Sequence, residues 1–134
     1  MDKLQLELQR IFQDFELIVH GDLYTDLGKI FKHHGNAQEF FSALRTRLKT
    51  LKELGVKAIA PPGFEKLKSS GHFAMRFKGR HNIRILFNYS EKQELMLLAF
   101  DRKEGKGTSD YGAFFPEADS RYSELAELIR RGTL

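Results

Sequence analysis

Apolar residues recur at helical spacing through the first half of the chain. Between Asn36 and Gly55 they form one stripe: Phe40, Phe41, Leu44, Leu48, Leu51 and Leu54. This spacing predicts an amphipathic helix, begun by a capping box of Asn36 and Glu39 and ended by Gly55. A shorter stripe, Leu23, Leu27, Ile30 and Phe31, predicts a helix capped by Asp22 and ended by Gly35. The two helices form a predicted hairpin over residues 22–55.

The N-terminal extension, residues 1–13, fits two patterns. Leu4, Leu6 and Leu8 alternate as in a strand, whereas Leu4, Leu8, Ile11, Phe12 and Phe15 recur as in a helix. The longer pattern favours a short amphipathic helix with Asp2 as its N-cap. The next residues, 15–20 (FELIVH), are rich in aromatic and β-branched side chains and predict a strand.

The second half of the chain predicts antiparallel strands followed by a helix. Pro61-Pro62-Gly63 breaks the helical pattern, and short turn signals separate apolar runs over residues 64–104. Alternation places Phe73, Met75 and Phe77 on one face of a strand and Arg76 and Lys78 on the other. Residues 109–131 read as a helical segment with Pro116 in a first turn and an apolar face of Ala118, Tyr122, Leu125 and Ile129. Residues 1–134 are therefore expected to form one α+β domain, an antiparallel sheet with an N-terminal helical hairpin and a C-terminal helix.

Composition narrows the functional classes. The formal net charge is +4, and the basic residues gather between Phe64 and Tyr111, which favours a polyanionic partner such as RNA, DNA or an acidic protein. The alternative is a basic surface that serves solubility only. The chain has no cysteine, which excludes disulfides, thiolate metal sites and a cysteine nucleophile. We expect no metal or other cofactor, no membrane partner and a cytoplasmic location, because the chain shows neither a signal peptide nor an apolar run of membrane-spanning length.

Individual residues suggest candidate chemistry. Arg84 lies in an otherwise apolar strand and needs either a carboxylate, such as Asp101 or Glu104, or an anionic ligand. Tyr111 follows a loop rich in cations, and nearby positive charge would lower the pKa of its phenol and make it a candidate general base. The alternatives are that its ring stacks on a nucleobase or that it is a packing residue. His72 and His81 flank the basic strand and are expected to be solvent-exposed turn residues, with proton transfer as the alternative.

From about Gly35 to Leu128 the chain resembles RelE/ParE-type toxins, in particular the HigB-like, phage-derived branch. The matching segments are NAQEFFSALRTRLKTLKELG, FEKLKSSGHFAMRFKGRHNIRILFNY and LMLLAFDRKEGKGTSDY. The family pattern begins with a lysine-leucine strand, here Lys66-Leu67, and continues with a strand that ends in a basic pair, here Arg76 and Lys78. An arginine at the start of an apolar strand follows, here Arg84, and then a basic cluster, here Arg102-Lys103-Lys106. Ala74 stands where some members carry a catalytic lysine.

The resemblance implies a RelE-like fold and the toxin of a type II toxin–antitoxin pair. Ribonuclease members cut mRNA in the ribosome without a metal, by attack of the 2′-hydroxyl on the adjacent phosphorus, and so inhibit translation. The implied catalytic residues are Arg76, Arg84, Lys103 and Tyr111. The expected nucleic-acid-binding residues are Lys66, Lys68, Lys78, Arg80, Arg102 and Lys106. The implied partners are mRNA, the ribosome and a cognate antitoxin, which is expected to be a small helix-turn-helix protein. Two alternative functions stay open: a non-catalytic ParE-like inhibitor of a protein such as gyrase, and an orphan domain without activity.

Overall fold

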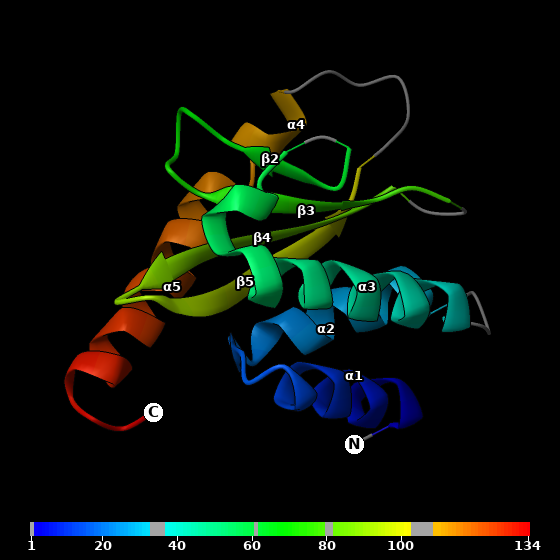
Figure 1. The fold of residues 1–134 in the computed structure, drawn as a ribbon, viewed down its shortest axis with the longest axis horizontal. Helices are drawn as coiled ribbons and strands as arrows, with labels where there is room; N and C mark the ends of the chain where they lie inside the picture. The colour runs from blue at the N-terminus through cyan, green and yellow to red at the C-terminus, as the bar shows by residue number, and fades with distance from the viewer. Residues whose placement is uncertain (1, 33–36, 61, 80–81, 103–108) are drawn as a thin grey trace.

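The computed structural model describes residues 2–32, 37–60, 62–79, 82–102 and 109–134 (Figure 1). The helices are α1 (Lys3–Asp14), α2 (Asp22–Phe31), α3 (Gln38–Leu54), the short 3₁₀ helix η1 (Gly55–Ala58), α4 (Ser109–Gly112) and α5 (Phe115–Arg130). The strands are β1 (Ile18–Val19), β2 (Phe64–Lys66), β3 (Phe73–Phe77), β4 (Ile83–Ser90) and β5 (Gln93–Asp101). This order confirms the predicted α+β class, the N-terminal helices, the run of strands and the C-terminal helix.

The strands of the described residues form one five-stranded sheet in the order β1-β5-β4-β3-β2. Strands β2 to β5 are antiparallel neighbours, as predicted. The prediction of a wholly antiparallel sheet is wrong at β1, which runs parallel to β5 with Ile18 opposite Leu95. Helices and three strands separate β1 from β5 along the chain, so no tight hairpin forces an antiparallel pairing there.

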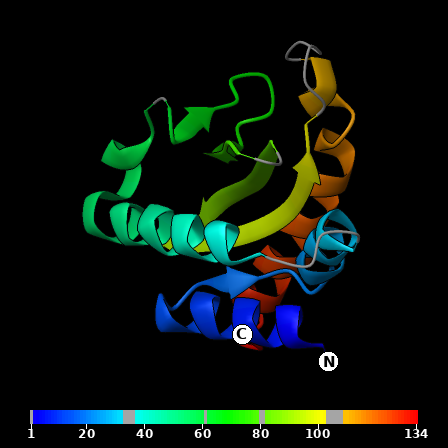
Figure 2. The same cartoon turned by 90° about the vertical axis from the view of Figure 1, so that its right-hand side faces the viewer.

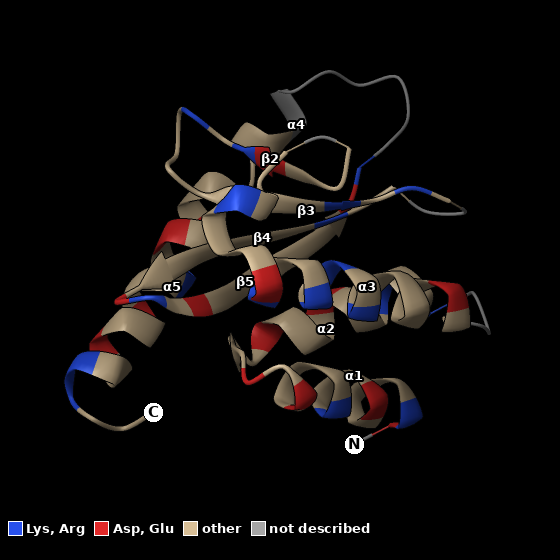
Figure 3. Cartoon of the chain, viewed as in Figure 1, with Lys and Arg blue, Asp and Glu red and all other residues tan. Residues whose placement is uncertain are grey.

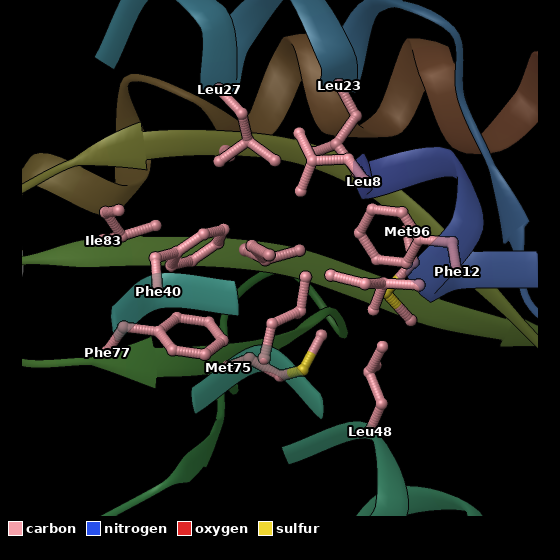
Figure 4. Close-up of a cluster of buried hydrophobic side chains, with 14 of the residues drawn as sticks. Leu8, Phe12, Leu23, Leu27, Phe40, Leu48, Met75, Phe77, Ile83 and Met96 are labelled. Atoms are coloured by element: carbon pink, nitrogen blue, oxygen red, sulfur yellow. The ribbon is translucent and has the colours of Figure 1, made fainter. Parts of the chain in front are cut away.

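Both faces of the sheet are covered. Helices α1, α2 and α3 contribute to the core on one face, into which Phe73, Met75 and Phe77 project as predicted. Figure 4 shows side chains from these helices meeting those of the strands in this core. Helix α5 packs on the opposite face, where Ala118 and Leu125 are buried in a second core (Figures 1 and 2). A charged side chain on a central strand therefore has little open surface to reach.

The helix ends agree with the predictions in part. Asp2 caps α1 by accepting a hydrogen bond from the Gln5 N–H at 2.8 Å. Gly55 ends α3 with a φ of 60°, a conformation that glycine adopts without strain. The prediction that α2 is capped by Asp22 is wrong, because the N-cap is Gly21 and Asp22 lies in the first turn. The ring of His20 accepts the Asp22 N–H there at 3.2 Å.

Other local predictions need correction. Helix α3 begins after Ala37, which as N-cap has no side chain able to cap it; Asn36 of the predicted capping box and Gly35 of the predicted helix end lie outside the described residues. Leu54 is 52% exposed and does not belong to the buried stripe. The predicted strand over residues 15–20 shortens to β1, because Glu16 has a φ of 55° and turns the chain before it.

Side chains from two helices hold the edge of β5. The Ala99 N–H donates to Asp26 Oδ2 at 3.1 Å. Arg121 of α5 donates through Nη1 to the same carboxylate at 2.7 Å and to the Leu97 carbonyl at 3.0 Å. Because β1 pairs with β5 only around residues 95 and 96, the groups farther along that edge need other partners. The Asp26–Arg121 pair supplies them and ties α2, β5 and α5 together.

We predict that Asp26→Ala lowers the free energy of unfolding by about 3 kcal/mol, because it removes the more buried of the two carboxylate partners of Arg121 and leaves only the exposed Glu117. Urea unfolding followed by circular dichroism measures this. Glu127→Ala breaks ion pairs to Arg130 and Arg131 at the exposed end of α5 and serves as the control, with little expected change. Equal losses of unfolding free energy in the two variants would show that the Asp26–Arg121 pair stabilises the fold no more than an exposed ion pair does.

Candidate functional site

Two arginines face each other across neighbouring strands. Arg76 of β3 is the register partner of Arg84 of β4. The Arg76 N–H donates to the Gly63 carbonyl at 2.8 Å, and the Arg76 carbonyl accepts from Arg47 Nε at 3.2 Å, so both backbone groups point away from β4. A pair of this kind lacks mutual backbone bonds and holds its Cα atoms only about 4.5 Å apart. Like charges so placed repel each other, which makes the position favourable for an anion.

Figure 3 shows Lys and Arg gathered toward one end of β3 and β4. Lys78, directly after β3, is exposed there, and Arg102 directly follows β5. The sheet thus concentrates positive charge at one end, as the sequence pattern suggested.

Arg84 is buried, with 3% of its surface exposed. Its Nε donates to the Tyr111 hydroxyl oxygen at 3.0 Å and its Nη1 to the Ile83 carbonyl at 3.1 Å. The Tyr111 hydroxyl in turn donates to Glu65 Oε1 at 3.1 Å. The partner found for Arg84 is thus a phenol. Of the two carboxylates suggested by the sequence, Asp101 instead accepts from the Asn82 N–H, and Glu104 lies outside the described residues.

Tyr111 is also buried, at 2% exposed, and its ring packs edge-on against Phe100 with Arg102 lying over it. Burial raises the pKa of Tyr111; the positive charge of Arg84 acts against this and the carboxylate of Glu65 adds to it. The expectation of a lowered pKa is therefore wrong, because burial outweighs the lowering effect of the Arg84 cation. At neutral pH the phenol keeps its proton, which makes it a hydrogen-bond donor and a candidate acid rather than a base.

Arg76 completes the cluster and is only partly exposed. Its Nε atom is buried and has no hydrogen-bond partner among the described residues. An unpaired buried N–H is costly, and an anion bound between the two guanidinium groups would remove that cost. Arg84 and Glu65 offset each other within the hydrogen-bonded group, and Arg76 beside it makes the formal charge of the cluster positive.

The remaining predicted site residues divide into three groups. Lys66, Lys68 and Lys78 are exposed, and Lys66 lies opposite Phe73, on the other face of β2 from Glu65. Arg102 contacts the Tyr111 ring, with its guanidinium carbon 5.7 Å from the ring centroid. Arg80, Lys103 and Lys106 lie outside the described residues, so their predicted roles stay predictions.

His72 is not the exposed turn residue that we expected. It is 3% exposed, and its Nε2 lies 2.7 Å from Asp119 Oδ1 of α5. Asn88 Nδ2 lies 3.0 Å from its Nδ1, which places the proton of a neutral imidazole on Nε2, toward the aspartate. The ring joins the start of β3 to α5 and thus has a structural role; His81 lies outside the described residues.

Two residues of the site escaped the sequence reasoning. Glu65 had a usable signal, because it follows the core residue Phe64 and strand alternation turns it toward the face of Arg76. Arg47 had none, because the periodicity of α3 assigns it only to the surface, and its contact with Arg76 joins segments far apart in the chain.

Comparison with protein-family models, with curated proteins and with solved structures found no match to this chain. The described His, Asp and Glu side chains form no group of three or more that could hold a metal ion. None of the helices in the described ranges combines the length and apolar character needed to cross a membrane.

We predict that the wild-type protein loses stability as the pH rises above about 10, and that Tyr111→Phe reduces this loss. The raised pKa means that the folded state keeps the phenol proton where the unfolded chain has released it, so folding becomes less favourable as the pH increases through this range. Urea unfolding at several pH values between about 8 and 11 measures the difference. The comparison of wild type with Tyr111→Phe isolates Tyr111, because Tyr24 and Tyr89 are present in both proteins. Identical dependence of stability on pH in the two proteins would contradict the prediction.

Proposed function

We propose that this chain has a RelE-like fold and acts as the toxin of a type II toxin–antitoxin system, as an mRNA endoribonuclease at the ribosome. The observation that carries the proposal is the pairing of Arg76 and Arg84 on neighbouring strands, with Tyr111 and Glu65 hydrogen-bonded beside them. The cluster offers cations for a phosphate, a protonated phenol and a carboxylate. These are the groups that cleavage of RNA by its own 2′-hydroxyl requires.

In the proposed binding step, a backbone phosphate of mRNA lies between the two guanidinium groups. Planar guanidinium donors match phosphate oxygens in pairs. Arg76 is the more accessible arginine and makes the first contact. The phosphate then replaces the Tyr111 hydroxyl as the partner of Arg84, which frees the phenol to act on the substrate. The exposed Lys68 and Lys78 add contacts to neighbouring phosphates, whereas Lys66 projects from the other face of β2.

In the proposed chemical step, the 2′-oxygen bonds to phosphorus and the bond from phosphorus to the 5′-oxygen breaks. Glu65 accepts the 2′ proton, and Tyr111, whose phenol is protonated at neutral pH, gives its proton to the departing 5′-oxygen. The arginines stabilise the negative charge on the phosphorane. The products are a 2′,3′-cyclic phosphate and a free 5′-hydroxyl.

The second candidate is a non-catalytic toxin of the ParE type that binds a protein target. The burial of Arg84 and Tyr111 favours it, because a closed network of this kind also serves simply to hold β4 against α4. In either case a helix-turn-helix antitoxin with an acidic segment that covers the cationic end of the sheet is the expected partner.

We predict that Arg76→Ala lowers the rate of mRNA cleavage about 100- to 1000-fold, the effect of losing one donor to a transition-state oxyanion. Purified protein is added to ribosomes carrying an mRNA, and cut sites are mapped by primer extension. Lys49→Ala is the matched control, since it removes one positive charge from the exposed side of α3 on the opposite face of the sheet.

Two results would count against the ribonuclease. Equal cleavage by the two variants would show that Arg76 is not part of the site. Growth arrest by the wild-type protein with intact mRNA would instead favour the second candidate, and Arg76→Ala would then be tested for loss of binding to the protein target.

A further inference from the structure

Strand β2 begins one residue too late to complete the pairing of Arg76. Continuing the register of Phe64 with Met75 places Gly63 opposite Arg76. The Gly63 carbonyl accepts the Arg76 N–H at 2.8 Å, as in an ordinary ladder. The Arg76 carbonyl, however, accepts its hydrogen bond from Nε of Arg47 at 3.2 Å. A side chain of α3 thus occupies the place of a ladder donor beside the candidate site.

Gly63 leaves the space that Arg47 needs. A Cβ atom at residue 63 would lie 3.0 Å from Arg47 Nε and 3.1 Å from its Cζ, tighter than most such contacts, so the Arg47 guanidinium would have to shift. The φ of Gly63 is outside the left-handed region, so space rather than backbone conformation accounts for the glycine. On its other side, the Arg47 guanidinium lies over the Phe77 ring, 5.7 Å from the centroid. Three contacts therefore define one position for this guanidinium.

We infer that Arg47 is a positioning residue for the arginine site: its hydrogen bond fixes the β3 backbone at the residue whose side chain must face Arg84. This inference rests on the proposed binding of RNA phosphate by Arg76. Repulsion between the two opposed guanidinium groups tends to push them apart, and on the β2 side Gly63 accepts the Arg76 N–H but leaves the Arg76 carbonyl to another donor. Arg47 is that donor, and so keeps the Arg76 side chain in place before the phosphate arrives.

The test measures the affinity of a labelled single-stranded RNA oligonucleotide together with the melting temperature of each variant. Arg47→Met keeps the apolar stem over Phe77 and removes the donor. We expect it to weaken RNA binding about two- to tenfold, the range given by one hydrogen bond of ordinary net strength. Gly63→Ala, which displaces Arg47, should produce a similar loss. Arg45→Met is the matched control, because Arg45 is on the same helix but pairs with Glu7 and Asp14; its RNA affinity should stay near that of the wild type.

A double-mutant cycle separates positioning from the other roles. If Arg47 acts through Arg76, Arg47→Met has no further effect on RNA binding in the Arg76→Ala background. If Arg47 contacts RNA itself, the two losses add, which would overturn the inference. A lower melting temperature with unchanged affinity would also overturn it, because that result assigns Arg47 to stability alone. Should Arg47→Met fail to fold, Arg47→Lys takes its place, because it keeps the charge and removes only the planar donor. We expect it to cause a smaller loss of RNA affinity, which again disappears in the Arg76→Ala background.

Failure of the proposed function gives a different pattern. If the wild-type protein does not bind RNA, both the proposed function and the inference fall. If the wild type binds and Arg76→Ala weakens binding while Arg47→Met and Gly63→Ala do not, only the inference is overturned.

Discussion

The sheet of this protein is longest in its middle, and its edges depend on side chains from the helices. Strands β4 and β5 have 8 and 9 residues, whereas β1 and β2 have 2 and 3. Backbone groups beyond the short strands must find other partners. Asp26 and Arg121 supply them at β5, and Arg47 supplies one at β3. These polar contacts orient α2, α3 and α5 on the sheet in a way that apolar packing, which is non-directional, does not.

The same geometry explains why positive charge gathers at one end of the sheet. Cores cover both faces, so arginines on the central strands have little room and must be hydrogen-bonded inside the protein or meet a ligand. Arg84 Nε donates to Tyr111 and its Nη1 to the Ile83 carbonyl. Arg76, its neighbour across the strands, keeps a buried Nε without a partner among the described residues. This difference within one pair is the main physical reason for proposing that the cluster binds a phosphate.

The sequence predicted what depends on local periodicity. The stripe from Phe40 to Leu51 placed α3, and the alternation of Phe73, Met75 and Phe77 placed the inner face of β3. It did not predict the parallel pairing of β1 or the burial of His72, because these depend on contacts between distant segments. The same division between local pattern and distant contact holds for the candidate site. Strand alternation placed Arg76 on the face away from the first core, but its position opposite Arg84 depends on the register of β3 with β4. The raised pKa of Tyr111 follows from its burial, which no local pattern reveals.

The central claim is that the face shared by Arg76 and Arg84 binds a phosphate of RNA. The most direct measurement is nuclear magnetic resonance of the arginine Nε–H groups during titration with a short single-stranded RNA, with Arg10 as an exposed reference on α1. The account predicts that the Arg76 Nε–H resonance shifts and becomes protected from exchange, because this buried donor gains an acceptor, and that the Arg84 resonance shifts as its phenol partner is replaced. Unchanged Arg76 and Arg84 resonances, with shifts only at exposed lysines and arginines, would contradict it.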